Sequence, residues 1–262
     1  MTTTDLNIDL LRKLCELPGI PGREEAVREF VREEMAPLVD EINVDALGNL
    51  IGVRRGQGGP RVMLAAHMDE IGFIVKHIDD KGFLRLQRTG GIFVVLEALR
   101  ALDGPTTAEI IAVATVQEEV GTRGASTAAF AYEPDVALAL DDSPADDYAG
   151  APEESAGLRL GPGVGIKAMD MGTIPNYRLN LHLKRLARDN GIPFQMEILV
   201  RGGTDAGAMQ RARSGAPTSA LSIPVRYAHT VNETCSPTDV QATIDLLKLF
   251  LEHTHEGDYR KR

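Results

Sequence analysis

The sequence predicts an α/β protein, a three-layer α/β/α sandwich around a mainly parallel, mixed sheet. Short apolar runs of strand length alternate with longer segments of helical periodicity through most of the chain, which is typical of βαβ units. Several apolar runs also end abruptly in acidic residues or histidine, as strands do at the ligand-binding edge of an open α/β sheet. The length suits one large domain, and we expect a single domain over residues 1–262.

The N-terminal quarter is expected to form two helices and a hairpin. Leucines recur every three to four residues in the first helix, which Pro18 ends. The second helix carries glutamates in its first turn, where they complement the helix dipole. Two short runs around a glycine turn then predict an antiparallel pair of strands. The expected ranges are helices at 5–17 and 24–35 and strands at 41–45 and 49–53.

The rest of the chain is expected to alternate between strands and helices. The last helix has the clearest start, with Ser236 as N-cap, Pro237 in the first turn and Asp239 behind them. The glycine-rich stretch 161–165 is expected to form a loop beside the substrate. The expected strands are 61–66, 71–78, 82–88, 109–116, 135–140, 194–200 and 218–223, and the expected helices are 92–102, 124–132, 176–190, one opened by Asp205 and one from 236.

Composition excludes several classes of function. The formal charge is −10 and no basic stripe is present, which argues against nucleic acid as a partner. No window approaches about 18 consecutive apolar residues, so no membrane span is expected. The two cysteines, Cys15 and Cys235, lack the spacing of a disulfide framework, and no signal peptide is visible. We therefore expect a cytoplasmic protein.

Metal-type side chains follow four of the expected strands. Because parallel strands end at one edge of a sheet, these side chains are expected to share a site. Imidazole and carboxylate ligands suit Zn²⁺, Co²⁺ or Mn²⁺. The residues concerned are His67 and Asp69, Glu118 and Glu119, Asp141 and Asp142, and His229.

The adjacent glutamates Glu118 and Glu119 allow a division of labour. Successive side chains at a strand end point in different directions, so one carboxylate can bind a metal while the other accepts a proton from water. Metal binding lowers the pKa of water from ~15.7 to about 7, which brings it within reach of a carboxylate base.

Four motifs in order resemble the TET (tetrahedral) aminopeptidases, a group of dinuclear metallopeptidases that includes the glutamyl aminopeptidases. The motifs are HMDEIG at 67–72, QEEVG at 117–121, GTDA at 203–206 and SIPVRYAH at 222–229. The resemblance spans nearly the whole chain. It implies two divalent metals per chain, zinc or cobalt, peptides as substrates, and a homododecamer.

The same resemblance implies a role for each matching residue. His67, Glu119, Asp141 and His229 would be metal ligands, with His229 on the second metal. Asp69 would orient His67, and Glu118 would be the general base. Gly203, Thr204 and Asp205 would line the substrate side, where a helix N-terminus offers N–H donors. Asp142 matches no ligand position.

The sequence departs from this family in one region. Members carry an inserted PDZ-like β-domain of roughly ninety residues, which we infer to be deleted here at about residues 88–91. The carboxylate that bridges the two metals should follow the insert, but residues 87–90 read Gln-Arg-Thr-Gly. Asp79 and Asp80 belong to a predicted turn and are not expected to replace it. The insert also carries dimer contacts, so its loss predicts a monomer or small oligomer.

We therefore expect a metal-dependent aminopeptidase that releases N-terminal residues from peptides, weakened or inactive, with one bound metal or none. Two alternatives stay open. One is an engineered scaffold that lacks the insert and has no catalysis, for which the junction Gly90-Gly91 is the argument. The other is an amidohydrolase that acts on acyl-amino acids.

Overall fold

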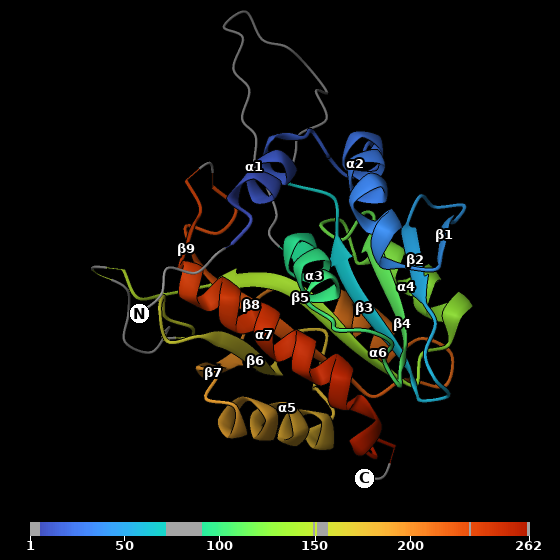
Figure 1. The fold of residues 1–262 in the computed structure, drawn as a ribbon. Coiled ribbons are helices and arrows are strands. Elements are labelled where there is room, and N and C mark those ends of the chain that lie inside the picture. The colour runs from blue at the N-terminus through green and yellow to red at the C-terminus, as the bar shows by residue number, and fades with distance from the viewer. Residues whose placement is uncertain (1–5, 72–90, 149, 151–156, 231, 261–262) are drawn as a thin grey trace, which may run out of the picture.

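The fold is one continuous mixed sheet with helices on both faces (Figure 1). The computed structural model describes residues 6–71, 91–148, 150, 157–230 and 232–260. The strands are β1 Glu41–Val44, β2 Leu50–Arg54, β3 Arg61–His67, β4 Glu109–Thr115, β5 Val136–Pro144, β6 Val164–Met169, β7 Phe194–Ile198, β8 Thr218–Arg226 and β9 Thr234–Cys235. The helices are α1 Ile8–Glu16, α2 Glu25–Met35, α3 Gly91–Arg100, α4 Arg123–Tyr132, α5 Tyr177–Asp189, α6 Asp205–Gln210 and α7 Pro237–His253, with short 3₁₀ turns at Ala36–Leu38 and Thr254–Glu256.

Strand order and direction confirm the predicted fold class. Along the sheet the order is β1-β2-β4-β3-β5-β8-β6-β7, and β9 pairs with β8. The centre is parallel, because β3 pairs in parallel with both β4 and β5, and β5 with β8. The flanks are antiparallel, where β2 meets β4 and β6 meets β8. The carboxyl ends of the four central strands therefore meet at one edge.

Alternation along the central strands divides the core into two layers. Leu64 and Leu138 belong to the layer that packs with α1, α3 and α7. Their strand neighbours Ala65 and Ala139 belong to the layer under α4 and α6, which is built mainly from alanines and other small residues. Small side chains let these two helices approach the sheet closely. In the described part of the chain, no helix combines the length and the hydropathy needed to cross a bilayer.

Gly91 begins α3 in close contact with the sheet. A Cβ atom at this position would lie 2.2 Å from the carbonyl oxygen of Leu140, at the level where β5 approaches its functional end. Only glycine fits such a contact without moving the helix. Packing therefore accounts for the second glycine of the Gly90-Gly91 pair, which weakens its interpretation as a linker left by a deletion.

A Gly91→Ala substitution is expected to destabilise the fold. The added methyl group must displace backbone atoms, and overpacking of this kind costs roughly 1–3 kcal/mol. Urea unfolding measures the loss. Gly172→Ala is the matched control, because its Cβ would meet its nearest neighbour at an ordinary 3.6 Å. Equal stability of the two variants would contradict the packing argument.

One prediction for the middle of the chain holds only in part, because residues 161–163 form a turn whereas 164 and 165 belong to a strand, and another falls outside the described residues. Residues 161–165 were expected to form a loop beside the substrate, yet Val164 begins β6. The backbone N–H groups of Gly161 and Gly163 donate to the Asp239 carboxylate at the start of α7, so this glycine-rich turn is tied to a helix. The expected strands 71–78 and 82–88, and nearly all of residues 87–91, lie outside the described residues.

His182, on α5, is a structural residue. Its Nδ1 lies 2.5 Å from the hydroxyl oxygen of Tyr259, and the ring is buried. Burial, together with the nearby Arg185, lowers the pKa of His182 to about 4.

Acid is therefore expected to weaken the fold through His182. The unfolded chain takes up a proton near pH 6.5, whereas folded His182 resists protonation until about pH 4, so stability is lost as the pH falls through this window. The linkage amounts to roughly 3 kcal/mol when the pH falls through the whole window. Urea unfolding between pH 4.5 and 7 should show a shallower pH dependence in His182→Phe than in the wild type. Parallel curves would exclude His182 as the source.

Candidate metal and catalytic site

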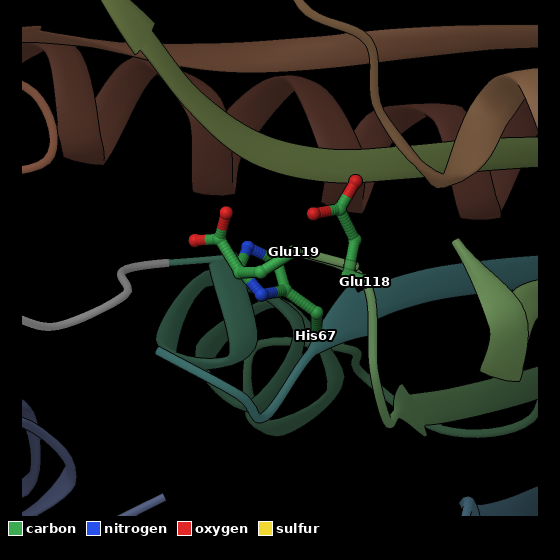
Figure 2. Close-up of side chains that lie close together, drawn as sticks. All are labelled: His67, Glu118 and Glu119. Carbon is green, nitrogen blue, oxygen red and sulfur yellow. The ribbon is translucent and has the colours of Figure 1, made fainter. Parts of the chain in front are cut away.

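The predicted site residues come from the functional edge of the sheet. His67 ends β3 beside Thr115, which ends β4, and Asp141 lies near the end of the neighbouring strand β5. Figure 2 shows His67, Glu118 and Glu119 gathered in one place. Ligand atoms of these three side chains lie within 4.8 Å of one another. Strand order thus joins residues that are far apart in the sequence.

The His67 ring is held in one tautomer. Its Nδ1 lies 2.9 Å from the backbone carbonyl oxygen of Asp69, which can only accept, so Nδ1 carries a hydrogen and donates it. The Asp69 carboxylate is more distant, with Oδ1 at 3.7 Å from Nδ1. Asp69 therefore orients His67 chiefly through its main chain. This leaves Nε2 directed at Asp141 Oδ1, 3.3 Å away.

The Asp69 carboxylate instead holds the two glutamates in position. It is fully buried, and its two oxygens accept hydrogen bonds from the backbone N–H groups of Glu118 at 2.9 Å and Glu119 at 3.1 Å. Gln117, just before them, has φ 56°, so the chain turns sharply as it leaves β4. This turn and the Asp69 carboxylate together fix the backbone from which both glutamates project.

The two glutamates have different proton affinities. Burial, reinforced by the Asp141 carboxylate, raises the pKa of Glu118 to about 9. Burial also raises the pKa of Glu119, to about 7, with His67 opposing the shift. Although burial disfavours its charged form, the adjacent Asp141 and Asp69 raise the pKa of His67 well above the usual value. A cluster of this kind binds positive charge, whether as protons or as a cation.

Glu119 belongs to a second histidine–carboxylate pair. His229, in the loop between β8 and β9, places Nε2 3.8 Å from Glu119 Oε1. Its side chain is largely exposed, whereas His67 and Asp141 are mostly buried. The structure thus contains two pairs, His67 with Asp141 and Glu119 with His229, and Glu118 lies beside them.

Asp205 is the member of the expected substrate-binding group that reaches this cluster. It opens α6, and its Oδ2 accepts a hydrogen bond of 2.6 Å from the Thr115 hydroxyl, while Oδ1 is buried without a partner. Burial raises the pKa of Asp205 to about 7, and the charges of His67 and Asp141 also act on it. Thr204 caps α6 through a hydrogen bond from the Ala206 N–H, and Gly203 precedes it as an exposed residue.

Two further carboxylates, those of Asp142 and Glu233, lie close to the cluster. Asp142 follows Asp141, and burial raises its pKa well above the usual value, helped by Asp141 and then Glu233. Glu233 was not singled out in the sequence. Its Oε1 accepts a 2.6 Å hydrogen bond from the backbone N–H of His229. A carboxylate four residues after a candidate ligand was the available signal, but only the loop geometry gives it meaning.

Glu233 holds a strained loop. Tyr227 and His229 have φ values of 60° and 62°, in the left-handed region that non-glycine residues rarely adopt. Each such residue costs on the order of 1–3 kcal/mol and persists only where the surrounding structure enforces it. The hydrogen bond to Glu233 is one such constraint, and it fixes the backbone from which the imidazole extends toward Glu119.

Glu233→Ala is therefore expected to weaken cation binding at the pair formed by Glu119 and His229. Loss of a group that orients a ligand typically costs 10–100-fold in metal affinity. Glu233→Gln keeps an oxygen acceptor and should stay within about threefold of the wild type. Titration with Co²⁺ followed by calorimetry provides the measurement. Identical affinities for the alanine variant and the wild type would show that the loop does not depend on this bond.

The cluster fits a divalent metal. In neutral His67 the lone pair of Nε2 would face a carboxylate oxygen, an arrangement that a proton or a cation must stabilise. Glu118 also needs a nearby positive charge, because a carboxyl group with a pKa of about 9 is protonated near neutral pH and cannot accept a proton. Nitrogen and oxygen ligands of this type suit Zn²⁺ or Co²⁺.

Comparison with known protein families decides the assignment. Residues 48–94 and 91–246 match the family profile described as M42 glutamyl aminopeptidase. The chain belongs to this family. M42 members are metal-dependent aminopeptidases, so this chain is a metalloaminopeptidase by family. The resemblance read from its four motifs is confirmed.

Individual M42 relatives agree with this assignment. The lysyl aminopeptidase of Pyrococcus furiosus is 29% identical over 349 aligned positions, covering 96% of this chain and 98% of the relative. An aminopeptidase from Desulfurococcus kamchatkensis has a similar structure, with a TM-score of 0.88 and 28% identity, covering 97% of this chain and 98% of the other.

A TET1 peptidase of Pyrococcus horikoshii, described as able to assemble into a tetrahedron or a large octahedral shell, has a TM-score of 0.80. The two chains are 26% identical, and the match covers 93% of this chain and 98% of the TET1 peptidase. These structures share the α/β architecture described above, so the predicted fold class is confirmed on this ground as well.

Proposed function

We propose that this chain is an aminopeptidase catalytic domain that releases N-terminal residues from peptides, with activity reduced by the loss of a bridging carboxylate. The observation that carries the proposal is the convergence of two histidine–carboxylate pairs and Glu118 at the carboxyl edge of the sheet. In this reading His67 and Asp141 hold one cation, and Glu119 and His229 form the other half of a dinuclear site.

The protein side chains divide the remaining work. A bound divalent cation would supply Lewis-acid polarisation of water and of the scissile carbonyl. Glu118 accepts the proton of the attacking water and returns it to the leaving amine. The Asp69 carboxylate holds Glu118 and Glu119 in position by accepting hydrogen bonds from their backbone N–H groups. Thr115 holds Asp205 close to the charges of His67 and Asp141. Gly203, Thr204 and Asp205 remain the residues expected to line the substrate side.

Two findings support the inferred deletion at about residues 88–91. The alignment with the lysyl aminopeptidase has 349 positions against 262 residues in this chain, so at least 87 positions have no residue here. The family profile also matches as two segments that meet at residues 91–94. Such a break is the expected result when an inserted domain is absent, and it coincides with the start of α3.

The proposal extends to metal, assembly and compartment. Zinc or cobalt is the expected metal, and the number held tightly is one or none. The chain is expected to be a monomer or small oligomer, in contrast to the large assemblies of the TET1 peptidase. Only two cysteines, without disulfide-framework spacing, support a cytoplasmic setting.

A substrate panel tests the proposed reaction. The metal-loaded chain should cleave peptides and aminoacyl anilides with a free α-amino group, but not the same compounds after N-acetylation. Release of amino acids from N-acyl-amino acids would instead favour an amidohydrolase. No turnover of any substrate, with or without Zn²⁺ or Co²⁺, would favour a scaffold without catalysis.

A further inference from the structure

The outer edge of the sheet at β7 is apolar. Fifteen large hydrophobic side chains are exposed among the described residues, and eight of them lie between residues 169 and 200. This segment comprises the end of β6, α5 and β7, which Figure 1 shows together at one end of the sheet. Exposed single apolar residues are ordinary, but a concentration of this kind marks an interaction surface.

Backbone contacts join the exposed residues at the ends of β6 and β7, and α5 packs against β6. Met169 on β6 is the register partner of Ile198 on β7. The loops that continue from these strands stay together, because the Met171 N–H donates to the Gly202 carbonyl. Tyr177 and Leu181 lie one turn apart on α5 and are both exposed. We call this surface the β7 edge patch.

The two edges of the sheet differ in chemistry. At the β1 edge the exposed residues include the polar Glu41 and Asn43, which is a common protection against strand pairing. At the β7 edge the exposed strand residues are Met196 and Ile198. Glu197, the charged residue of β7, points inward and contacts Lys167 and Ser143, so it places no charge on the outer surface.

The area of the patch fits a dimer. A side chain of this size covers on the order of 100 Å² when fully buried. The eight residues are about 60% exposed on average, so they present roughly 500 Å² of apolar surface. Interfaces of standard size bury about 800 Å² per partner, and somewhat more than half of that area is apolar, so the patch has the area of a small, non-obligate dimer contact.

We propose that the β7 edge patch is a contact between two copies of this chain. Among the described residues β7 is the last strand of the sheet, so its outer backbone groups face no other described strand, and a two-fold axis would pair β7 antiparallel with its own copy. The same axis would bring the two sets of exposed methionines, Ile198 and Val200 into one apolar core. The proposal does not rest on the metal site or on the proposed activity.

Analytical ultracentrifugation of the full chain between about 1 and 100 µM tests the proposal. The wild type should sediment as a dimer of two 28.3 kDa chains. Ile198→Glu and, outside the strand, Met171→Glu should each weaken the dimer at least tenfold. Both side chains are exposed, so their replacement should leave the fold intact, which circular dichroism checks. Val44→Glu on β1 is the matched control at the opposite edge and should remain dimeric.

Three outcomes would overturn the proposal. A wild type that is monomeric at 100 µM would leave the patch to a different protein. A dimer that tolerates both Ile198→Glu and Met171→Glu would use another surface. Dissociation by Val44→Glu alone would place the contact at the β1 edge. None of these results bears on turnover, so they leave the proposed function to its own test.

Discussion

Loaded with Zn²⁺ or Co²⁺ and freed of excess metal, this chain should retain no more than one ion tightly. Two cations about 3.5–4 Å apart repel each other strongly unless a carboxylate lies between them. The described site supplies two histidine–carboxylate pairs, but residues 87–90, where the resemblance to the family places the bridging carboxylate, contain no acidic residue. Atomic absorption on the dialysed protein measures the stoichiometry.

Turnover should also be lower than in a family member that binds two cations. If the second cation contributes about 3 kcal/mol of transition-state stabilisation, its loss lowers kcat/KM on the order of 100-fold. Aminoacyl anilides provide the assay, and an M42 member that has the insert, measured under the same metal conditions, provides the reference. Two tightly bound ions together with turnover equal to that reference would refute the prediction.

A gain of binding offers the sharper control. Single aspartates introduced by Gln87→Asp, Arg88→Asp and Thr89→Asp scan the position of the missing ligand. We expect at least one of them to raise the bound metal above the wild-type value, and Arg88→Asp also removes a positive charge. If none does, the deletion has altered more than the single ligand.

Replacing the two adjacent glutamates one at a time should separate binding from catalysis. Glu118→Gln removes the proposed base, and kcat should fall about 10²–10⁴-fold while metal affinity changes little. Glu119→Gln removes a proposed ligand that lies 3.8 Å from His229, so metal affinity itself should fall. Both substitutions preserve side-chain size and the backbone N–H groups that Asp69 binds.

The two readouts must be compared in the same preparations. Calorimetry gives the metal affinity of each variant, and anilide hydrolysis at saturating metal gives kcat. The assignment of roles would be reversed if Glu118→Gln lost metal and Glu119→Gln kept it. Equal losses of both quantities in both variants would indicate that the glutamates share one role as ligands, which their common membership of the 4.8 Å cluster would allow.

The sequence alone determined the fold class and the kinds of ligand. Strand and helix periodicities are local properties, so the alternation of short apolar runs with helical segments could be read directly. Placing metal-type residues at the ends of those runs required only one further rule, that parallel strands share a carboxyl edge. The motifs around His67, Glu118, Thr204 and His229 were sufficient for the family.

Only the tertiary structure decided which residues act together. His67 and Asp141 are 74 positions apart, and their contact depends on β5 lying next to β3, which no local pattern encodes. Glu233 was overlooked because its role depends on a loop with left-handed backbone angles. The strand β6 was missed because its glycine-rich approach is fixed by Asp239, 76 to 78 positions away.

The same reason explains Gly91 and the β7 edge. In the sequence, the pair Gly90-Gly91 is compatible with a linker. In the structure, a Cβ at Gly91 would clash with the carbonyl oxygen of Leu140, so packing requires a glycine there. Met196 and Ile198 read as ordinary strand residues until the strand order places β7 at the end of the sheet with both side chains exposed. Local sequence sets which elements form, whereas strand order and long-range packing set which of their faces meet a ligand, another element or solvent.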